Sequence, residues 1–241
     1  IDLNNVGELS YINEAGGQFE IGAMTRDRDI ESSPDVREKC GLLALASSWI
    51  GHTQIRNRST IGGGAAHNDP AGEIPAVLLA LGARILIRNQ IGEIREEAAE
   101  DFFVTYLTTT LEPTDLLVGF RIPFHPSNSG FAVEEFARRS GDFAIAGTMA
   151  LVTLQDGYCQ SARISMIGVG PTAIFAADAC EALAGAKPNA ALIEEAAKIV
   201  REAVDPDDDI HASAVYRREL AEVLTKDCLT TAFQNAGADL G

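Results

Sequence analysis

The feature that most constrains how this chain can fold is a change of pattern at Gly170-Pro171. After this point the sequence is rich in alanine and has the apolar spacing of helices. Before it, short apolar or alternating stretches favour strands, and Asp156-Gly157 between two apolar runs is a strong hairpin signal. This pattern predicts an α+β fold. We expect strands near 18–24, 84–88, 93–95, 116–122, 130–138, 144–154 and 158–168, and late helices near 174–184, 191–204 and 212–233.

Two further helices are expected within the strand-rich part. Ser33-Pro34 has the form of an N-cap followed by proline at the first helical position, which predicts a helix over 34–50. Asp69-Pro70 repeats this signal, whereas 51–69 shows no useful periodicity. We expect Trp49 to lie in the core. The buried faces of the second helix and of the last helix should comprise Ile74, Val77, Leu78 and Leu81, and Val215, Leu220, Val223, Leu224 and Leu229.

A cluster of proline, serine, asparagine and glycine near 124–130 marks a boundary within the chain. We therefore expect a first domain over 1–125 and a second domain over 126–241. The acidic run 205–209 separates the last two helices and is interpreted as a solvated linker and helix cap.

The composition excludes several classes of protein. A hydrophobic share of 46% in 241 residues argues against disorder, and no apolar run reaches the roughly 18 residues that a membrane helix needs. The net charge of −16 repels nucleic acid and anionic lipid. We expect a globular, cytoplasmic protein with no nucleic-acid partner and no membrane insertion.

The cysteines and histidines do not suggest a metal site. Cys40, Cys159, Cys180 and Cys228 include no closely spaced pair, and the four histidines form no H-x-x-x-H pair. We expect buried thiols of a cytosolic protein and no metal. The chain opens without methionine, a basic region or an apolar signal segment, so we expect that an upstream piece is missing.

The segment 54–73 carries the strongest indication of chemistry. It contains Gly62, Gly63 and Gly64, which can adopt positive φ and let a ligand approach the main chain. Successive N–H groups in such a loop can form a nest for a phosphate, and Thr60 adds a hydroxyl. Asp69 and Glu73 can accept hydrogen bonds from sugar hydroxyls. These features suit a nucleotide.

Other interpretations of this segment remain open. A glycine run is more often a flexible connection than a ligand site, and Asp69 could be only a helix N-cap. The segment is neither a P-loop nor a Rossmann fingerprint, because no Lys-Ser/Thr follows the glycines and no G-x-G-x-x-G follows a strand.

The segment 54–73 closely resembles the second flavin-binding motif of the FAD-binding medium subunits of molybdenum hydroxylases. This family includes the carbon monoxide dehydrogenase medium subunit and the flavin domain of xanthine dehydrogenase. The resemblance covers essentially the whole chain, with further matching stretches at 21–25, 112–117, 121–123, 136–144, 168–170 and 211–218.

The resemblance implies a vanillyl-alcohol-oxidase-like FAD-binding domain, present here as its second subdomain, followed by a smaller C-terminal α+β domain. It also implies an iron–sulfur small subunit and a molybdopterin large subunit as partners. Electrons would pass from molybdenum through two [2Fe–2S] clusters to FAD and then to an external acceptor. The implied FAD-binding residues are Ile50, Thr60, Ile61, Gly62, Gly63, Gly64, Glu73 and Leu117, with no catalytic residue of the chain's own.

Two departures from the family pattern stand out. The resemblance implies a first FAD-binding loop in an N-terminal subdomain of about fifty residues, which we expect to be missing here. Ala15-Gly16-Gly17-Gln18 is similar to that loop, but its flanks match a later hairpin turn, so it is not assigned to FAD. In addition, Glu134 and Glu135 stand where several relatives carry a lysine near the cofactor.

Several residues and functions stay open at this stage. Arg138, Arg139 and Asp142 are interpreted as an interdomain ion network, with contact to a partner subunit as the alternative. His67 is interpreted as a hydrogen-bonded loop residue. The main alternative to a flavin subunit is a cofactor-free fragment or docking subunit of the same assembly. A stand-alone flavin oxidase ranks last, because no acid–base set is apparent.

Overall fold

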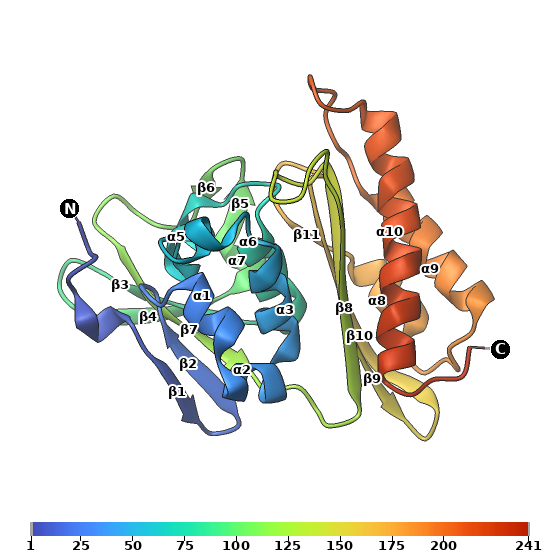
Figure 1. Cartoon of the computed structure of the whole chain (residues 1–241), viewed down its shortest axis with the longest axis horizontal. Coiled ribbons are helices and arrows are strands. Elements are labelled where there is room, and N and C mark those ends of the chain that lie inside the picture. Colours follow the sequence, from blue (N-terminus) through green and yellow to red (C-terminus); the bar gives the residue numbers. More distant parts are fainter. Residues whose placement is uncertain (1, 241) are drawn as a thin grey trace.

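A computed structural model describes residues 2–240 of the chain, and its elements form four alternating layers (Figure 1). A five-stranded sheet of order β1-β2-β7-β3-β4 is covered on one face by the helices of the first half of the chain. A four-stranded sheet of order β11-β10-β9-β8 follows, and α8, α9 and α10 form the outermost layer. The predicted α+β fold is confirmed.

The first unit contains the elements up to β7. They are a 3-10 helix η1 (Gly7–Leu9), β1 (Ile12–Ala15), β2 (Gln18–Gly22), α1 (Asp27–Ser32), α2 (Pro34–Lys39), α3 (Gly41–Trp49), α4 (Thr53–Arg56), α5 (Ile61–His67), α6 (Glu73–Leu81), β3 (Arg84–Arg88), β4 (Ile94–Ala98), α7 (Ala99–Phe102), β5 (Phe103–Thr105), β6 (Thr108–Thr109) and β7 (Leu116–Pro123).

The second unit contains the remaining elements. They are β8 (Ser129–Phe136), β9 (Ala146–Gln155), β10 (Tyr158–Ile167), β11 (Ile174–Phe175), α8 (Ala177–Leu183), α9 (Ala190–Ala203) and α10 (Ala214–Asn235). Within residues 2–240, no helix has the length and apolar character needed to cross a membrane.

The predicted strands and hairpins are present. β9 and β10 pair antiparallel, and Asp156 and Gly157 between them have φ of 53° and 83°, as a tight hairpin turn requires. Gly16 and Gly17 also have positive φ and join β1 to β2, which confirms that this pair belongs to a hairpin turn. Strand β1 was not predicted, because its side chains are mostly exposed.

Helix α6 joins the two units because it lies between the two sheets. All nine of its residues are buried, so the predicted single apolar face is too narrow a description. Its backbone accepts hydrogen bonds from the second sheet: Arg163 Nε donates to Ala80 O at 2.9 Å, and Ser165 Oγ donates to Ala76 O at 2.8 Å. A helix that is apolar all round is expected in such a buried position.

The expected helix over 34–50 is wrong in one respect, because it is two helices. Cys40 has φ of −147° and separates α2 from α3. Gly41 then lies against the ring of Phe131 in β8, and a Cβ there would come within 2.3 Å of the Phe131 Cζ. This contact with a distant strand requires the change of direction.

Three other boundaries also differ from expectation. The aperiodic stretch 51–69 contains the short helices α4 and α5. The helix expected at Asp69-Pro70 begins only at Glu73, since Asp69 Oδ1 accepts from Ala71 N at 2.9 Å in a separate turn. The first late helix is shorter than expected, because Ile174–Phe175 forms the edge strand β11.

The core expectations are partly wrong. Trp49 is 37% exposed and is not a core residue, while Val215 and Val223 lie on the exposed side of α10. The buried residues of α10 are Arg217, Ala221, Leu224, Thr225, Cys228, Leu229, Ala232 and Phe233. All four cysteines are buried free thiols, as expected.

Candidate functional site

The glycine run lies in the first turn of α5, not in a loop. None of Gly62, Gly63 and Gly64 has positive φ. The N–H groups are already used: Ile61 N donates to Thr25 O at 3.1 Å, Gly62 N donates to Ala23 O at 2.9 Å, and Gly63 N donates to the N-cap Thr60 Oγ1 at 3.1 Å. The prediction of a positive-φ phosphate nest is therefore wrong.

The three glycines have different surroundings. A Cβ on Gly62 would come within 2.5 Å of Ala23 O, and one on Gly64 would come within 2.9 Å of Ile74 Cγ1. These two glycines let α5 pack closely against its neighbours. Gly63 is exposed, and a Cβ there would meet only Thr60 Oγ1 at 3.0 Å. Gly63 is thus the position where bare main chain faces outward.

A group of buried carboxyls lies behind this turn. Glu73 is the first residue of α6, and burial raises its pKa to about 7, with a further contribution from Asp27 and Asp69. Asp27 is 1% exposed, and burial raises its pKa to about 6. The Oδ1 atom of Asp27 is shielded from solvent and has no hydrogen-bond partner among residues 2–240.

Glu135 extends this group toward the second unit. Burial raises the pKa of Glu135 to about 8, and the nearby Glu73 carboxyl adds to the shift. Its Oε1 atom is also shielded and without a partner among residues 2–240. Unsatisfied buried acceptors are rare in folded proteins and call for donors. Asp27, Glu73 and Glu135 therefore form a set of acceptor groups that a hydroxyl-rich ligand could satisfy.

Glu135 also lines a small pocket of about 300 Å³ between the two units. One wall is the end of α3, with Trp49 and Gly51. The opposite wall is the loop between β8 and β9. The lining residues are Ser48, Trp49, Gly51, Glu135, Ala137, Arg139, Ser140, Gly141 and Asp142.

A larger cavity of about 690 Å³ lies on the other side of the same loop, and Gly141 and Asp142 line both spaces. The turn before α6, the β5–β6 turn and the acidic linker before α10 contribute its other walls. Tyr106 Oη donates to Asp207 Oδ2 at 2.8 Å and so joins two of these walls. The acidic run is therefore a cavity wall as well as a linker.

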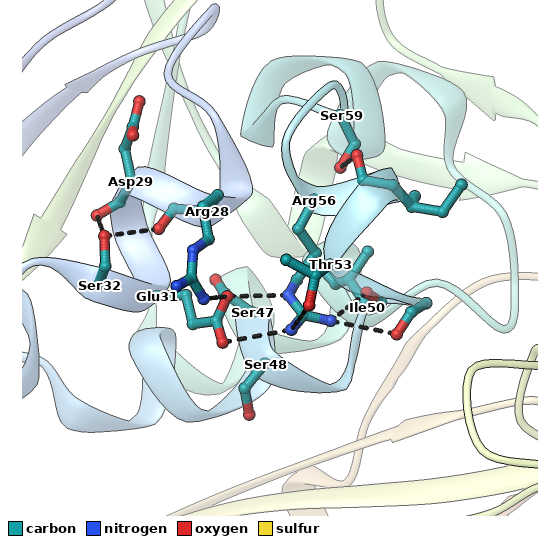
Figure 2. A network of polar contacts seen from close by, with 12 residues as sticks. Arg28, Asp29, Glu31, Ser32, Ser47, Ser48, Ile50, Thr53, Arg56 and Ser59 are labelled. Atoms are coloured by element: carbon teal, nitrogen blue, oxygen red, sulfur yellow. Dashed lines mark hydrogen bonds and ion pairs between the residues drawn. The ribbon is translucent and has the colours of Figure 1, made fainter.

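Arg56 holds the segment that follows α3 (Figure 2). Its guanidinium donates to both carboxylate oxygens of Glu31, at 2.8 and 3.3 Å, and to Ile50 O and Gly51 O at 3.0 and 3.1 Å. Burial of Glu31 raises its pKa, but hydrogen bonds from Arg56 and Arg28 outweigh this and lower it overall. Arg56 thereby fixes one wall of the small pocket.

Arg217 performs the same task in the second unit. It is buried, and it donates to Ile145 O, to Gly168 O at 2.9 Å and to Asp209 Oδ2 at 2.7 Å. These acceptors lie on three separate segments that line the larger cavity. Sequence analysis missed both arginines, because their partners are identified only in the folded chain.

The other candidate residues are distributed unevenly. Ile50 is half-buried between two residues that line the small pocket, whereas Leu117 of β7 is enclosed in the core. The His67 side chain is exposed, with Nε2 3.8 Å from Asp69 Oδ2. The proposed ion network of Arg138, Arg139 and Asp142 is wrong, since none of them forms an ion pair within residues 2–240. Instead they line the two cavities.

The described part of the chain contains no group of three His, Cys, Asp or Glu side chains arranged to hold a metal ion. The arrangement of buried acceptors, an exposed main-chain turn and two adjacent cavities instead fits an organic ligand of considerable length.

Comparison with known proteins places these features in a family. Residues 1–125 match the FAD binding domain in molybdopterin dehydrogenase, and residues 131–232 match the CO dehydrogenase flavoprotein C-terminal domain. The chain is similar to subunit alpha of the 6-hydroxypseudooxynicotine dehydrogenase complex of Paenarthrobacter nicotinovorans, with 36% identity over 98% of this chain and 80% of that protein.

Carbon monoxide dehydrogenases are also among the relatives. The medium chain from Hydrogenophaga pseudoflava is 33% identical over 97% of this chain and 81% of that protein. A solved structure of carbon monoxide dehydrogenase from the same organism superposes with a TM-score of 0.94, at 34% identity, over 96% of this chain and 80% of that chain. The chain belongs to the family of flavin-binding medium subunits of molybdenum-containing dehydrogenases.

Proposed function

We propose that this chain holds FAD and passes electrons through it to an external acceptor. The electrons would come from iron–sulfur clusters on a small subunit, and a large molybdopterin subunit would oxidise the substrate. The observation that carries the proposal is the exposed main chain at Gly63 beside the buried carboxyls of Asp27, Glu73 and Glu135.

The chemistry of these residues fits the cofactor. The ribityl and ribose hydroxyls of FAD are donors, and Asp27 Oδ1 and Glu135 Oε1 are shielded acceptors without partners in the described chain. The Thr60 hydroxyl, which accepts from Gly63 N but can still donate its own hydrogen, would contact the diphosphate region where the backbone at Gly63 faces outward, with Ile61, Gly62 and Gly64 shaping the turn. A phosphate nest offers N–H donors, whereas the free groups here are carboxylate acceptors. Most of the contact would therefore be with the hydroxyls of FAD.

The remaining residues of the proposed site would supply a hydrogen-bond acceptor and apolar contacts. Glu73 would accept from a sugar hydroxyl, Ile50 would provide apolar packing, and Leu117, which is enclosed in the core, would contribute to the packing beneath the site. FAD, when bound, supplies the electron-transfer chemistry, and the protein supplies orientation and hydrogen bonds. We further propose that residues 1–125 form the FAD-binding domain and residues 126–241 a separate domain, with the cavities at their junction.

The four unpaired, buried cysteine thiols support a cytoplasmic location for this subunit, because a reducing compartment keeps such thiols free.

The variant Gly63→Ala tests the site. Its Cβ would face outward and meet only Thr60 Oγ1 at 3.0 Å, a contact that a small shift of the threonine side chain relieves, and alanine is the better helix former by about 0.5–1 kcal/mol. We expect the variant to fold at least as well as the wild type but to bind FAD at least tenfold more weakly. Urea unfolding measures the first property, and flavin absorption after desalting, together with titration, measures the second.

Gly7→Ala is the control, since a Cβ on Gly7 meets nothing within 4 Å and lies outside the proposed site. It should change neither property. Unchanged FAD affinity in Gly63→Ala would remove α5 from the cofactor site. A colourless wild-type protein that still co-purifies with the other subunits would instead support the docking-subunit alternative. Turnover of an organic substrate by this chain alone would support a stand-alone oxidase.

A further inference from the structure

The larger cavity is not needed to explain how the carboxyl group and Gly63 would hold FAD. Its volume of about 690 Å³ is that of a typical small-molecule site. Apolar contact surface comes from Pro70, Phe143 and Ile145, and polar groups surround it. A 66% exposed Phe143 beside such a space can stack on a planar ligand.

The position of the cavity suggests what it binds. It meets the small pocket at Gly141 and Asp142, so molecules in the two spaces would be separated only by the β8–β9 loop. Resting on the proposed FAD function, we propose that the larger cavity binds the electron acceptor and that its carboxylates favour uncharged or cationic acceptors over anionic ones.

The charges around the cavity support the proposed preference for uncharged or cationic acceptors. Four aspartates line it, against Arg138, Arg217 and His211. The charge of Arg217 is already balanced by Asp209 at 2.7 Å. Asp69, Asp142 and Asp207 therefore face a single remaining arginine, Arg138, which forms no ion pair within residues 2–240.

A cavity with this excess of carboxylates repels anions, and the net charge of −16 on the chain adds to the effect. An acceptor with phosphate or sulfonate groups should enter poorly. An uncharged quinone Q fits the balance of the reaction: it takes up two electrons and two protons to leave as QH₂, and FADH₂ gives up the same number on returning to FAD.

The test uses the complete complex with its flavin reduced by titration with dithionite under anaerobic conditions. Stopped-flow absorption would follow flavin reoxidation by three probes: an uncharged benzoquinone, a benzoquinone sulfonate and a cationic phenazinium. The variants are Asp142→Asn and Asp207→Asn, which keep the side-chain shape. Because each probe is compared between variants, differences in driving force among the probes cancel.

We expect each aspartate variant to raise the second-order rate constant for the sulfonate about threefold and to lower that for the phenazinium by a similar factor. The rate constant for the uncharged quinone should change by a much smaller factor than those for the two charged probes. Arg138→Gln should shift both charged probes in the opposite direction. These differences should shrink as the salt concentration rises.

Asp156→Asn is the matched control, because it removes one carboxylate from the β9–β10 turn, at the end of the second sheet away from the β8–β9 loop. It should leave all three rate constants unchanged. Flavin content is measured first in every variant. If the wild-type complex binds no flavin, the proposed function fails and this inference fails with it.

Two other results would overturn the inference alone. One is flavin reoxidation that is indifferent to probe charge in the variants while flavin content stays normal. The other is loss of flavin from Asp142→Asn and Asp207→Asn, which would make the larger cavity part of the FAD site itself.

Discussion

Two buried arginines hold the walls of the two cavities, and they do so in different ways. Arg56 binds Ile50 O and Gly51 O, which lie only six and five residues away, and its carboxylate partner Glu31 is 12% exposed (Figure 2). Arg217 binds Ile145 O and Gly168 O, 72 and 49 residues away. Its partner Asp209 is 44% exposed.

This difference separates local stability from long-range geometry. Removing Arg56 would leave a buried carboxylate with one remaining partner, Arg28, and such stranded charges are costly. Removing Arg217 would leave an exposed carboxylate that water can solvate, but three distant segments would lose their common anchor. Arg56 should thus matter most for stability, and Arg217 most for the shape of the larger cavity.

The largest effect is expected for Arg56→Met. The substitution leaves the carbonyls of Ile50 and Gly51 without this donor and leaves Glu31 with Arg28 alone, which should lower the free energy of unfolding by about 4 kcal/mol. Urea unfolding followed by circular dichroism measures this. The double variant Arg56→Met/Glu31→Gln should recover part of the loss; no recovery would mean that the buried charge is not its cause.

Arg217→Met should cost less, about 3 kcal/mol, because Asp209 remains solvated. Its particular signature should be faster amide hydrogen exchange in the segments around Ile145 and Gly168. Arg218→Met is a suitable control, since its partner Asp205 is fully at the surface. A loss for Arg217→Met larger than that for Arg56→Met would reverse the comparison.

Unlike Glu31 and Asp209, the carboxyl of Glu135 has no arginine partner within residues 2–240. Burial raises the pKa of Glu135 to about 8 from its ordinary 4.5, so the folded protein holds this proton more tightly than the unfolded chain. Stability should therefore be full below about pH 4.5 and fall as the pH rises through about 8. Between pH 5.5 and 8.5 the wild type should lose about 3 kcal/mol more than Glu135→Gln. Parallel stability curves for the two proteins would contradict this.

The smallest effect is expected for Asp209→Asn. Asparagine keeps the Oδ1 acceptor for the His211 and Ala212 N–H groups, but it replaces the Oδ2 that accepts from Arg217 by an amide donor, so the charge and this one hydrogen bond are both lost. Because Asp209 is exposed, the loss should stay below about 1 kcal/mol in urea unfolding. A loss as large as that of Arg217→Met would show that the ion pair, and not the two carbonyl bonds, carries the clamp.

Much of the fold could be predicted from local patterns. The Asp156-Gly157 turn and its strands follow from residues that are neighbours in the sequence. Helix α5 could not be predicted, because glycines disfavour helices in isolation. There the absence of side chains is required by contacts with Ala23 and Ile74, which periodicity does not reveal.

The candidate site, too, could be predicted from the sequence only in part. The sequence by itself determined the α+β class, the turns and the family resemblance, and it led to the proposal that 60–64 and Glu73 contact the cofactor, since these depend on residue type and short spacing. Only the tertiary structure decided that α6 is covered on both sides and that Glu135 lies near Glu73. It also decided that Gly63 is the one of the three consecutive glycines that faces outward. The physical reason is that burial and electrostatic environment depend on segments that meet only when the second sheet packs onto the first unit.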